Sequence, residues 1–176
     1  KPNLSNGHVL FLTKATFGGN LAGLDGANAK CADAAKTAGL SGTFVALLGT
    51  NGRPIKEVIA ALPSDSKPII DTTARTIAAS YAELLSKGPS VALDHDEAGG
   101  SVTSSDATCA TSDAITWTGA NANGGTSSTD CYTWSDDNSA QKEGVGQVGL
   151  GFTKTNWLSS CDVRCVKKAH LYCVQK

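Results

Sequence analysis

Apolar positions near the N-terminus follow two different periods. The β-prone runs His8–Thr13 and Thr43–Leu48 predict two strands. Between them, small apolar residues recur every three or four positions from Leu24 to Ala38, which predicts an alanine-rich helix. Asp25 is its expected N-cap, and Gly39 stands where glycine is favoured after a helix end. The one cysteine of this stretch belongs to the apolar repeat, so we expect its side chain to face inward.

The rest of the chain gives a weaker pattern. It first predicts a helical turn, an extended piece and a short helix, at Lys56–Leu62, Pro68–Asp71 and Ser80–Leu85. A polar, turn-rich region follows, with β-prone pieces at Val91–Leu93, Ile115–Thr118 and Cys131–Trp134. His170–Val174 alternates and predicts a terminal strand. A strand and helix followed by short strands among long loops predict an α+β fold.

Length and charge exclude several classes of protein. The 176 residues suit one domain, and an apolar content of 40% excludes a disordered tail. The net charge is -1, and the one tight basic cluster, Arg164 with Lys167 and Lys168, is too small for a nucleic-acid groove. No apolar run approaches the ~20 residues that cross a bilayer, so we expect no membrane insertion by this chain. Any signal peptide or anchor is expected upstream of residue 1.

Cysteine usage gives the strongest compositional signal. Six cysteines, abundant small and hydroxyl residues and few aromatics indicate a secreted or cell-surface protein with up to three disulfides. Six cysteines allow 15 pairings, so their number leaves the connectivity open. A zinc site is the competing interpretation, but the sequence has no Cys-x-x-Cys pair and its three histidines are scattered.

Six ordered stretches carry a resemblance to a known family. They are Val9–Thr13, Gly19–Cys31, Thr116–Gly124, Asp130–Ser135, Gly144–Gly146 and Leu171–Val174. In this order they resemble the bacterial endostatin-like domains of spirochaete surface lipoproteins and other secreted bacterial proteins, which are related to the C-type lectin-like fold. The resemblance covers nearly the whole chain, which implies a single domain over residues 1–176, with 1–7 as a leader or linker from an upstream region.

The resemblance implies both a fold and a disulfide pattern. The N- and C-terminal strands pair, one or two helices pack beside them, and a long loop region stapled by disulfides lies above a second small sheet. The implied pairs are Cys31–Cys173, Cys131–Cys165 and Cys109–Cys161, with Cys161 as the alternative partner of Cys131. The calcium-dependent sugar motif of C-type lectins contains proline, and residues 101–165 contain none. The resemblance therefore implies no sugar–calcium site here.

The densest acidic stretch is a candidate metal site. Asp94, Asp96 and Glu97 place three carboxylates just before Gly99 and Gly100, and carboxylate oxygens are ligands that calcium prefers. The alternative is a solvated turn. Calcium is accordingly the one cofactor that the sequence suggests.

A second candidate site combines tryptophan rings with polar side chains. Its members are Trp134, Asp136, Asp137, Asn138, Asn156 and Trp157. A ring supplies apolar contact and the polar groups supply orientation, a mixture that suits sugar or protein recognition. The alternative is that the tryptophans fill the core of the loop region.

The sequence favours recognition over catalysis. It contains no Gly-x-Ser-x-Gly elbow, phosphate loop or His-Glu-x-x-His motif, so we expect no enzyme. We expect an adhesion domain of a bacterial surface or secreted protein that binds a host or prey cell-surface or matrix protein or glycan. It would suit the tip of a longer, trimeric fibre. A calcium-dependent glycan-binding lectin and a structural capping module are the alternatives.

Overall fold

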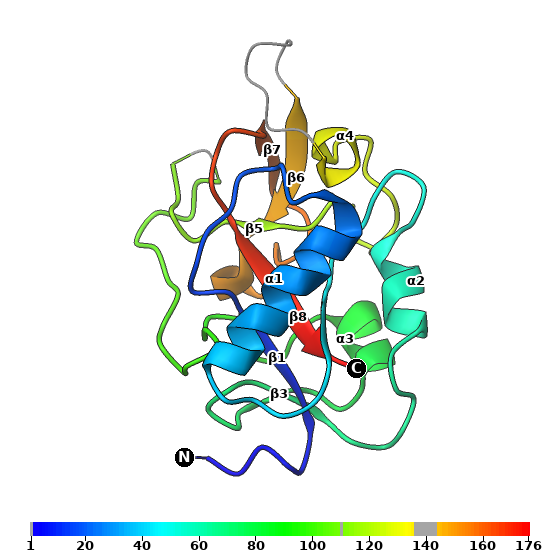
Figure 1. The fold of residues 1–176 in the computed structure, drawn as a ribbon, viewed down its shortest axis with the longest axis vertical. Helices are drawn as coiled ribbons and strands as arrows, with labels where there is room; N and C mark the ends of the chain where they lie inside the picture. The colour runs from blue at the N-terminus through cyan, green and yellow to red at the C-terminus, as the bar shows by residue number, and fades with distance from the viewer. Residues whose placement is uncertain (1, 110, 136–143) are drawn as a thin grey trace.

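A twisted β-sheet with helices on both faces forms the protein in a computed structural model, which describes residues 2–109, 111–135 and 144–176 (Figure 1). Within these residues the helices are α1 (Gly23–Thr37), α2 (Ile55–Ala60), α3 (Tyr81–Lys87) and the single turn α4 (Cys131–Trp134). The strands are β1 (His8–Leu12), β2 (Phe44–Ala46), β3 (Ile69–Ile70), β4 (Thr76–Ala78), β5 (Thr116–Trp117), β6 (Val145–Gly149), β7 (Cys161–Arg164) and β8 (His170–Gln175). None of the described helices is long and apolar enough to cross a membrane.

The two terminal strands lie at the centre of the sheet. The strand order is β4-β3-β1-β8-β5-β6-β7, and β2 also pairs with β8. β1 and β8 are antiparallel, with Leu10 opposite Val174 and Leu12 opposite Tyr172, which confirms the predicted pairing of the chain's ends. β5 joins the start of β8 in parallel, so β5, β6 and β7 continue the main sheet instead of forming a separate one.

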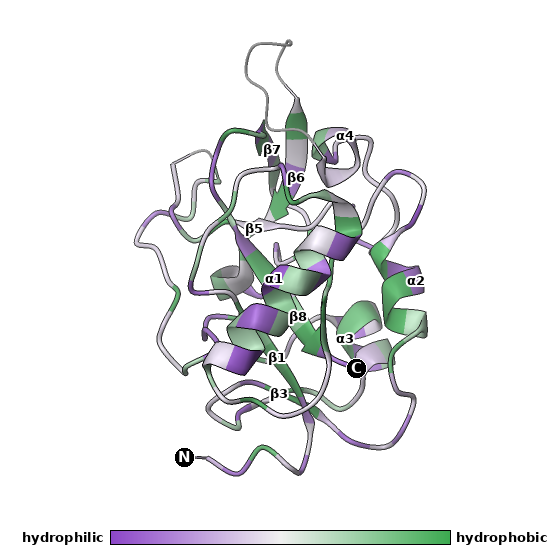
Figure 2. Cartoon of the chain, viewed as in Figure 1, coloured by the Kyte–Doolittle hydropathy of each residue, from purple (hydrophilic) through white to green (hydrophobic). Residues whose placement is uncertain are grey.

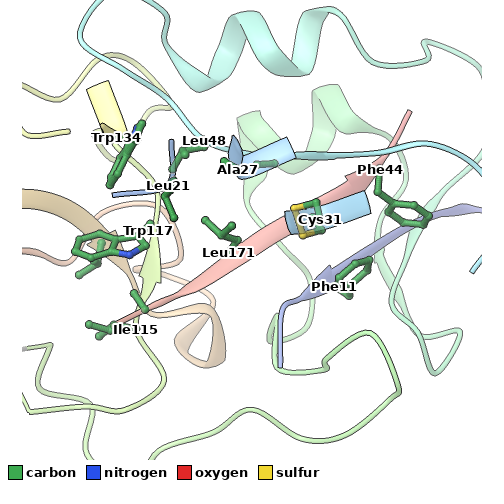
Figure 3. Close-up of a cluster of buried hydrophobic side chains, with 14 of the residues drawn as sticks. Phe11, Leu21, Ala27, Cys31, Phe44, Leu48, Ile115, Trp117, Trp134 and Leu171 are labelled. Atoms are coloured by element: carbon green, nitrogen blue, oxygen red, sulfur yellow. A yellow bond between two sulfur atoms is a disulfide. The ribbon is translucent and has the colours of Figure 1, made fainter. Parts of the chain in front are cut away.

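Alternate residues of the central strands belong to two hydrophobic clusters, one on each face of the sheet. In β1, Val9 and Phe11 belong to the α1 side, whereas Leu10 and Leu12 belong to the side of α2 and α3. The α1-side cluster also contains Trp117 and Trp134 (Figure 3). Because successive side chains of a strand point to opposite faces, β1 and β8 place buried side chains on both faces, and much of each strand is green in Figure 2.

Helix α1 agrees closely with its sequence pattern. Its buried residues are Ala27, Cys31 and Ala35, spaced one turn apart, and the small side chains allow close packing on the sheet. Gly39 has φ 70° and the helix ends in a Schellman motif, as predicted, with Leu40 N donating to Ala35 O. The predicted N-cap was wrong: Ala22 takes that position. Asp25 lies in the first turn, where its charge still favours the helix dipole.

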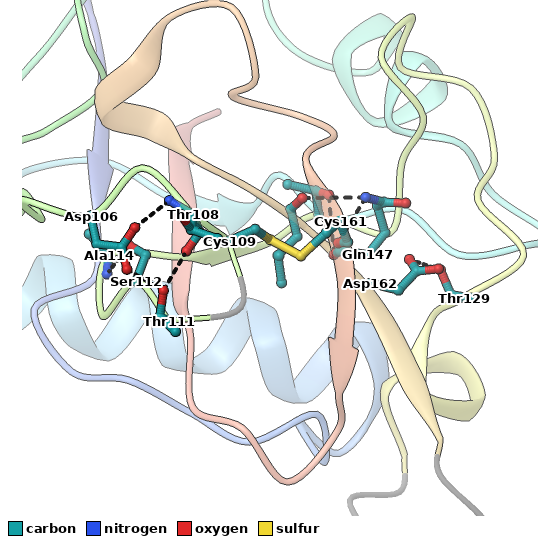
Figure 4. Close-up of a disulfide and its surroundings, with 12 residues drawn as sticks. Asp106, Thr108, Cys109, Thr111, Ser112, Ala114, Thr129, Gln147, Cys161 and Asp162 are labelled. Carbon is teal, nitrogen blue, oxygen red and sulfur yellow. Dashed lines mark hydrogen bonds between the residues drawn. A yellow bond between two sulfur atoms is a disulfide. The ribbon is translucent and has the colours of Figure 1, made fainter.

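Three disulfides join the described elements, in the pairs that the resemblance implies. Cys31–Cys173 links α1 to β8 across a sequence separation of 142, Cys131–Cys165 links α4 to the end of β7, and Cys109–Cys161 links a long loop to β7 (Figure 4). Closing the longest of these loops is worth roughly 4–5 kcal/mol on a chain-entropy estimate.

The structure corrects two predicted elements. Val91–Leu93 is not a strand, because Leu93 N donates to Gly151 O in an isolated loop contact. Cys131–Trp134 is a helical turn, not an extended piece. Strand β6 was not predicted, because its glycines are unfavourable in strands. The fold needs one of them, since a Cβ at Gly149 would lie 1.8 Å from the carbonyl oxygen of Trp157.

Candidate functional site

Both predicted binding tryptophans lie in the core. Trp134 is fully buried, its Nε1 donates to Gly49 O at 2.7 Å, and its ring centroid lies 5.5 Å from that of Trp117. Trp157 is also buried and packs edge-on against Tyr172, with 5.9 Å between centroids. The core alternative therefore holds for both, and neither ring is presented to a ligand in this structure.

The polar residues predicted beside these tryptophans do not assemble into a described site. Asn156 is exposed, and its backbone oxygen accepts a hydrogen bond from Leu150 N at 2.8 Å. Asp136, Asp137 and Asn138 lie outside the described residues, so their role stays a prediction.

The three predicted calcium ligands are held apart by different partners. Asp94 Oδ1 accepts from Arg75 Nη2, whereas Asp96 Oδ1 accepts from two backbone N–H groups of its own loop. Glu97 Oε2 accepts from Lys14 N at 2.7 Å. No group of three or more His, Cys, Asp or Glu side chains within the described residues is placed to hold a metal ion. The carboxylates instead order the loop that carries them.

A half-buried ion network ties this acidic loop to the turn after β3. Arg75 Nε donates to Asp71 Oδ2 and its Nη2 lies 2.5 Å from both Asp94 Oδ1 and His95 Nδ1. Burial raises the pKa of Asp71, but hydrogen bonds from Thr73 and Arg75 outweigh that effect and hold the pKa below its ordinary value. The network thus needs an ionised Asp71 to keep two loops together.

Turn α4 has an unusual backbone. Cys131, Tyr132, Thr133 and Trp134 all have positive φ, from 48° to 63°, although none is glycine. A left-handed conformation costs an L-residue about 1–2 kcal/mol, so four in succession persist only where the surroundings hold them. As a consequence Trp134 is buried in the core, whereas Tyr132, two residues earlier, is 57% exposed.

One aspartate and one disulfide hold the turn. Asp130 Oδ1 accepts from Thr133 N at 3.0 Å, and its Oδ2 accepts from Asn51 N at 2.9 Å. The Cys131–Cys165 bridge fixes the first residue of the turn to the sheet. These contacts, with the burial of the tryptophan, offset the strain of the left-handed residues.

Glycines make room for that bridge. A Cβ at Gly19 would lie 2.4 Å from Cys131 Sγ, and one at Gly146 would lie 2.8 Å from the same atom. A Cβ at Gly144 would lie 3.0 Å from the Tyr132 ring and 3.3 Å from Cys165 Sγ. The bare backbone at Gly144 thus lies next to one edge of the tyrosine ring and next to the bridge.

A comparison with protein families decides where this arrangement belongs. The family model described as Endostatin: Collagenase NC10 and Endostatin matches residues 8–176. The chain belongs to this endostatin family. A search of curated proteins finds no match. Endostatin-like domains are generally non-enzymatic, which suggests a recognition module. Three disulfides suggest an extracellular or secreted protein, because such bonds persist in oxidising compartments.

The exposed apolar side chains of this endostatin-like domain lie beside one bridge. Among the described residues the large apolar side chains that are exposed are those of Tyr132 and Val166, the latter at 47%. Val166 follows Cys165, and Gly144 is close to both the tyrosine ring and the sulfur of that cysteine. We call Tyr132, Val166 and the Cys131–Cys165 bridge the tyrosine platform.

Sequence reasoning missed the tyrosine platform because it assigned Cys131–Trp134 to an extended piece. Trp134 was chosen for the polar residues that follow it, and in a strand it would share one face with Tyr132. The left-handed turn places the two rings on opposite sides. Asp130, a residue that favours cap positions, was the available signal for a turn at this point.

Proposed function

We propose that this endostatin-like domain is an extracellular adhesion domain of a surface or secreted protein, and that it binds a protein of another cell or its matrix through the tyrosine platform. The observation that carries the proposal is the display of Tyr132. This residue is 57% exposed on a backbone that costs free energy to maintain. Single exposed apolar residues are common. A strained backbone that keeps such a residue exposed is not common.

The chemistry of the platform favours a protein partner. Tyrosine supplies a large, rigid contact surface with a polar end, and it is enriched among residues that dominate binding energy. Val166, which follows Cys165 of the same bridge, is the second exposed apolar residue of the platform. A pre-organised turn also lowers the entropy lost on association. Presentation at the tip of a longer fibre, as a trimer and on a bacterial surface, belongs to the same proposal.

A binding screen tests this proposal with a variant that changes the side chain of Tyr132 but suits the same backbone conformation. The domain would be immobilised and exposed to a panel of matrix proteins, cell-surface proteins and glycans, with biolayer interferometry as readout. Tyr132→Asn removes the ring but keeps a residue that tolerates left-handed φ. We expect saturable binding of at least one protein, weakened about tenfold or more by this variant. Lys36→Ala, on the exposed side of α1, should leave it unchanged.

Three other outcomes would contradict the proposal. Saturable protein binding that Tyr132→Asn leaves intact would place the binding face elsewhere. Binding of glycans alone would replace the protein partner by a lectin function. A folded domain that binds nothing in the panel would favour a structural capping module.

A further inference from the structure

A hollow between α1 and α2 shares no lining residue with the tyrosine platform. It encloses about 230 Å³ between α1, β2 and α2. Figure 1 shows the cyan segment of β2 running between these two helices. Its lining includes Leu24, Asn28, Val45, Arg53, Val58 and Lys176.

The floor of the hollow is apolar. β2 contributes Val45 and α2 contributes Val58, while α1 contributes Leu24. Leu24 and Val45 are only half-buried, so an apolar group placed on them would remove further apolar surface from water. This part of the site would bind an aliphatic body.

The polar side chains of the hollow offer hydrogen-bond donors. No carboxylate side chain lines it. Asn28 Oδ1 already accepts from Ala46 N at 2.9 Å, which leaves the amide nitrogen as a donor. The side chains of Arg53 and Lys176 are exposed, and within the described part of the chain neither makes an ion pair.

The two cations flank the floor from opposite ends of β2. Lys176 N donates to Thr43 O just before the strand, and Arg53 exchanges backbone hydrogen bonds with Thr50 beyond its end. An anionic group seated above β2 would therefore meet the Arg53 guanidinium at one end. Arginine binds a carboxylate through two parallel N–H donors, so it is the stronger anchor.

We propose that this hollow binds a small aliphatic carboxylate, with its hydrocarbon body on the floor and its carboxylate at Arg53. A volume of about 230 Å³ corresponds to roughly eight water-sized groups, which 4-methylpentanoate matches. The site is independent of the tyrosine platform and of the adhesion function.

Methyl and amide NMR titrations of the folded domain test the site. The probes are 4-methylpentanoate and the uncharged 4-methylpentanamide, which has nearly the same shape. The acid should give saturable shifts at Leu24, Val45 and Val58, and the amide should bind about tenfold or more weakly, because hydrogen bonds to ionised groups are the stronger ones.

A matched pair of variants assigns the charge. Arg53→Gln should weaken binding of the acid about tenfold, since it removes the charged fork and keeps the backbone bonds to Thr50. Lys56→Gln removes one positive charge nearby, on α2 but outside the hollow's lining, and should leave the affinity unchanged. Equal losses in both variants, equal affinities for acid and amide, or the absence of saturable shifts at these methyls would each overturn the proposal.

Discussion

At the scale of single residues, the space beside Gly19 decides whether the Cys131–Cys165 bridge fits. A Cβ at Gly19 would meet the sulfur of Cys131 at 2.4 Å, and neither the bridge nor the backbone yields easily. We expect Gly19→Ala to lower the free energy of unfolding by about 1–3 kcal/mol through overpacking. Gly52→Ala is the matched control, because nothing lies within 4 Å of its Cβ position. Urea unfolding with intact disulfides measures both, and equal midpoints would contradict the tight fit.

The ionised state of Asp71 belongs to the same scale. Because hydrogen bonds hold its folded pKa below the unfolded value of about 3.9, its charge stabilises the fold above that pH. This stability is lost as pH falls through the folded pKa. Asp71→Asn should therefore cost about 1–3 kcal/mol at pH 6 and flatten the decline below pH ~4. Asp113→Asn, at an exposed site, should keep the wild-type dependence of the free energy of unfolding on pH. If both variants showed the same dependence on pH, the ion network would have no role in stability.

At the scale of elements, the sequence pattern predicted those elements whose conformation depends on their own residues. Helix α1 was predictable because the spacing of its apolar residues indicates a helix and Gly39 indicates where it ends. Turn α4 was not, because its conformation depends on distant partners: Cys165 through the bridge and Gly49 through the hydrogen bond to Trp134. The same limit applied to the candidate site, where Trp134 was named and Tyr132, its neighbour in the turn, was overlooked.

The dependence of α4 on its bridge gives a prediction for this element. Cys131→Ser with Cys165→Ser should relax the left-handed turn and expose the Tyr132 peptide bond, so chymotrypsin should cleave after Tyr132 faster than in the wild type. Cys109→Ser with Cys161→Ser is the control. Its separation of 52 residues against 34 gives a similar chain-entropy cost of about 4 kcal/mol. Mass spectrometry would map the cuts. Equal cleavage after Tyr132 in both variants would mean that general destabilisation, and not loss of this bridge, opens the turn.

At the scale of the whole molecule, β1 and β8 couple the two hydrophobic clusters. Leu171 and Cys173 of β8 face the α1 side, whereas Tyr172 and Val174 face the other side. A strand cannot leave one cluster without leaving the other. The pairing of the chain's ends was predictable from a terminal apolar run at each end together with the family resemblance. Strand β6 was not, because its glycines, which allow close approach of other groups, obscure the strand pattern.

Shared strands predict that the two clusters unfold together. Leu10 and Phe11 are neighbours in β1, both are 1% exposed, and they belong to opposite clusters. Leu10→Ala and Phe11→Ala should each lower the free energy of unfolding by about 2–5 kcal/mol. Each should keep a single urea transition with an unchanged slope, because neither cluster has a strand of its own at the centre of the sheet. Tryptophan fluorescence and far-UV circular dichroism should then coincide, since Trp117 and Trp134 lie in one cluster and Trp157 in the other. An early transition in Leu10→Ala, seen by circular dichroism before the fluorescence of Trp117 and Trp134 changes, would show instead that the α2 and α3 side opens alone. The sheet would then act as a partition between two cooperative units, and not as the element that joins them.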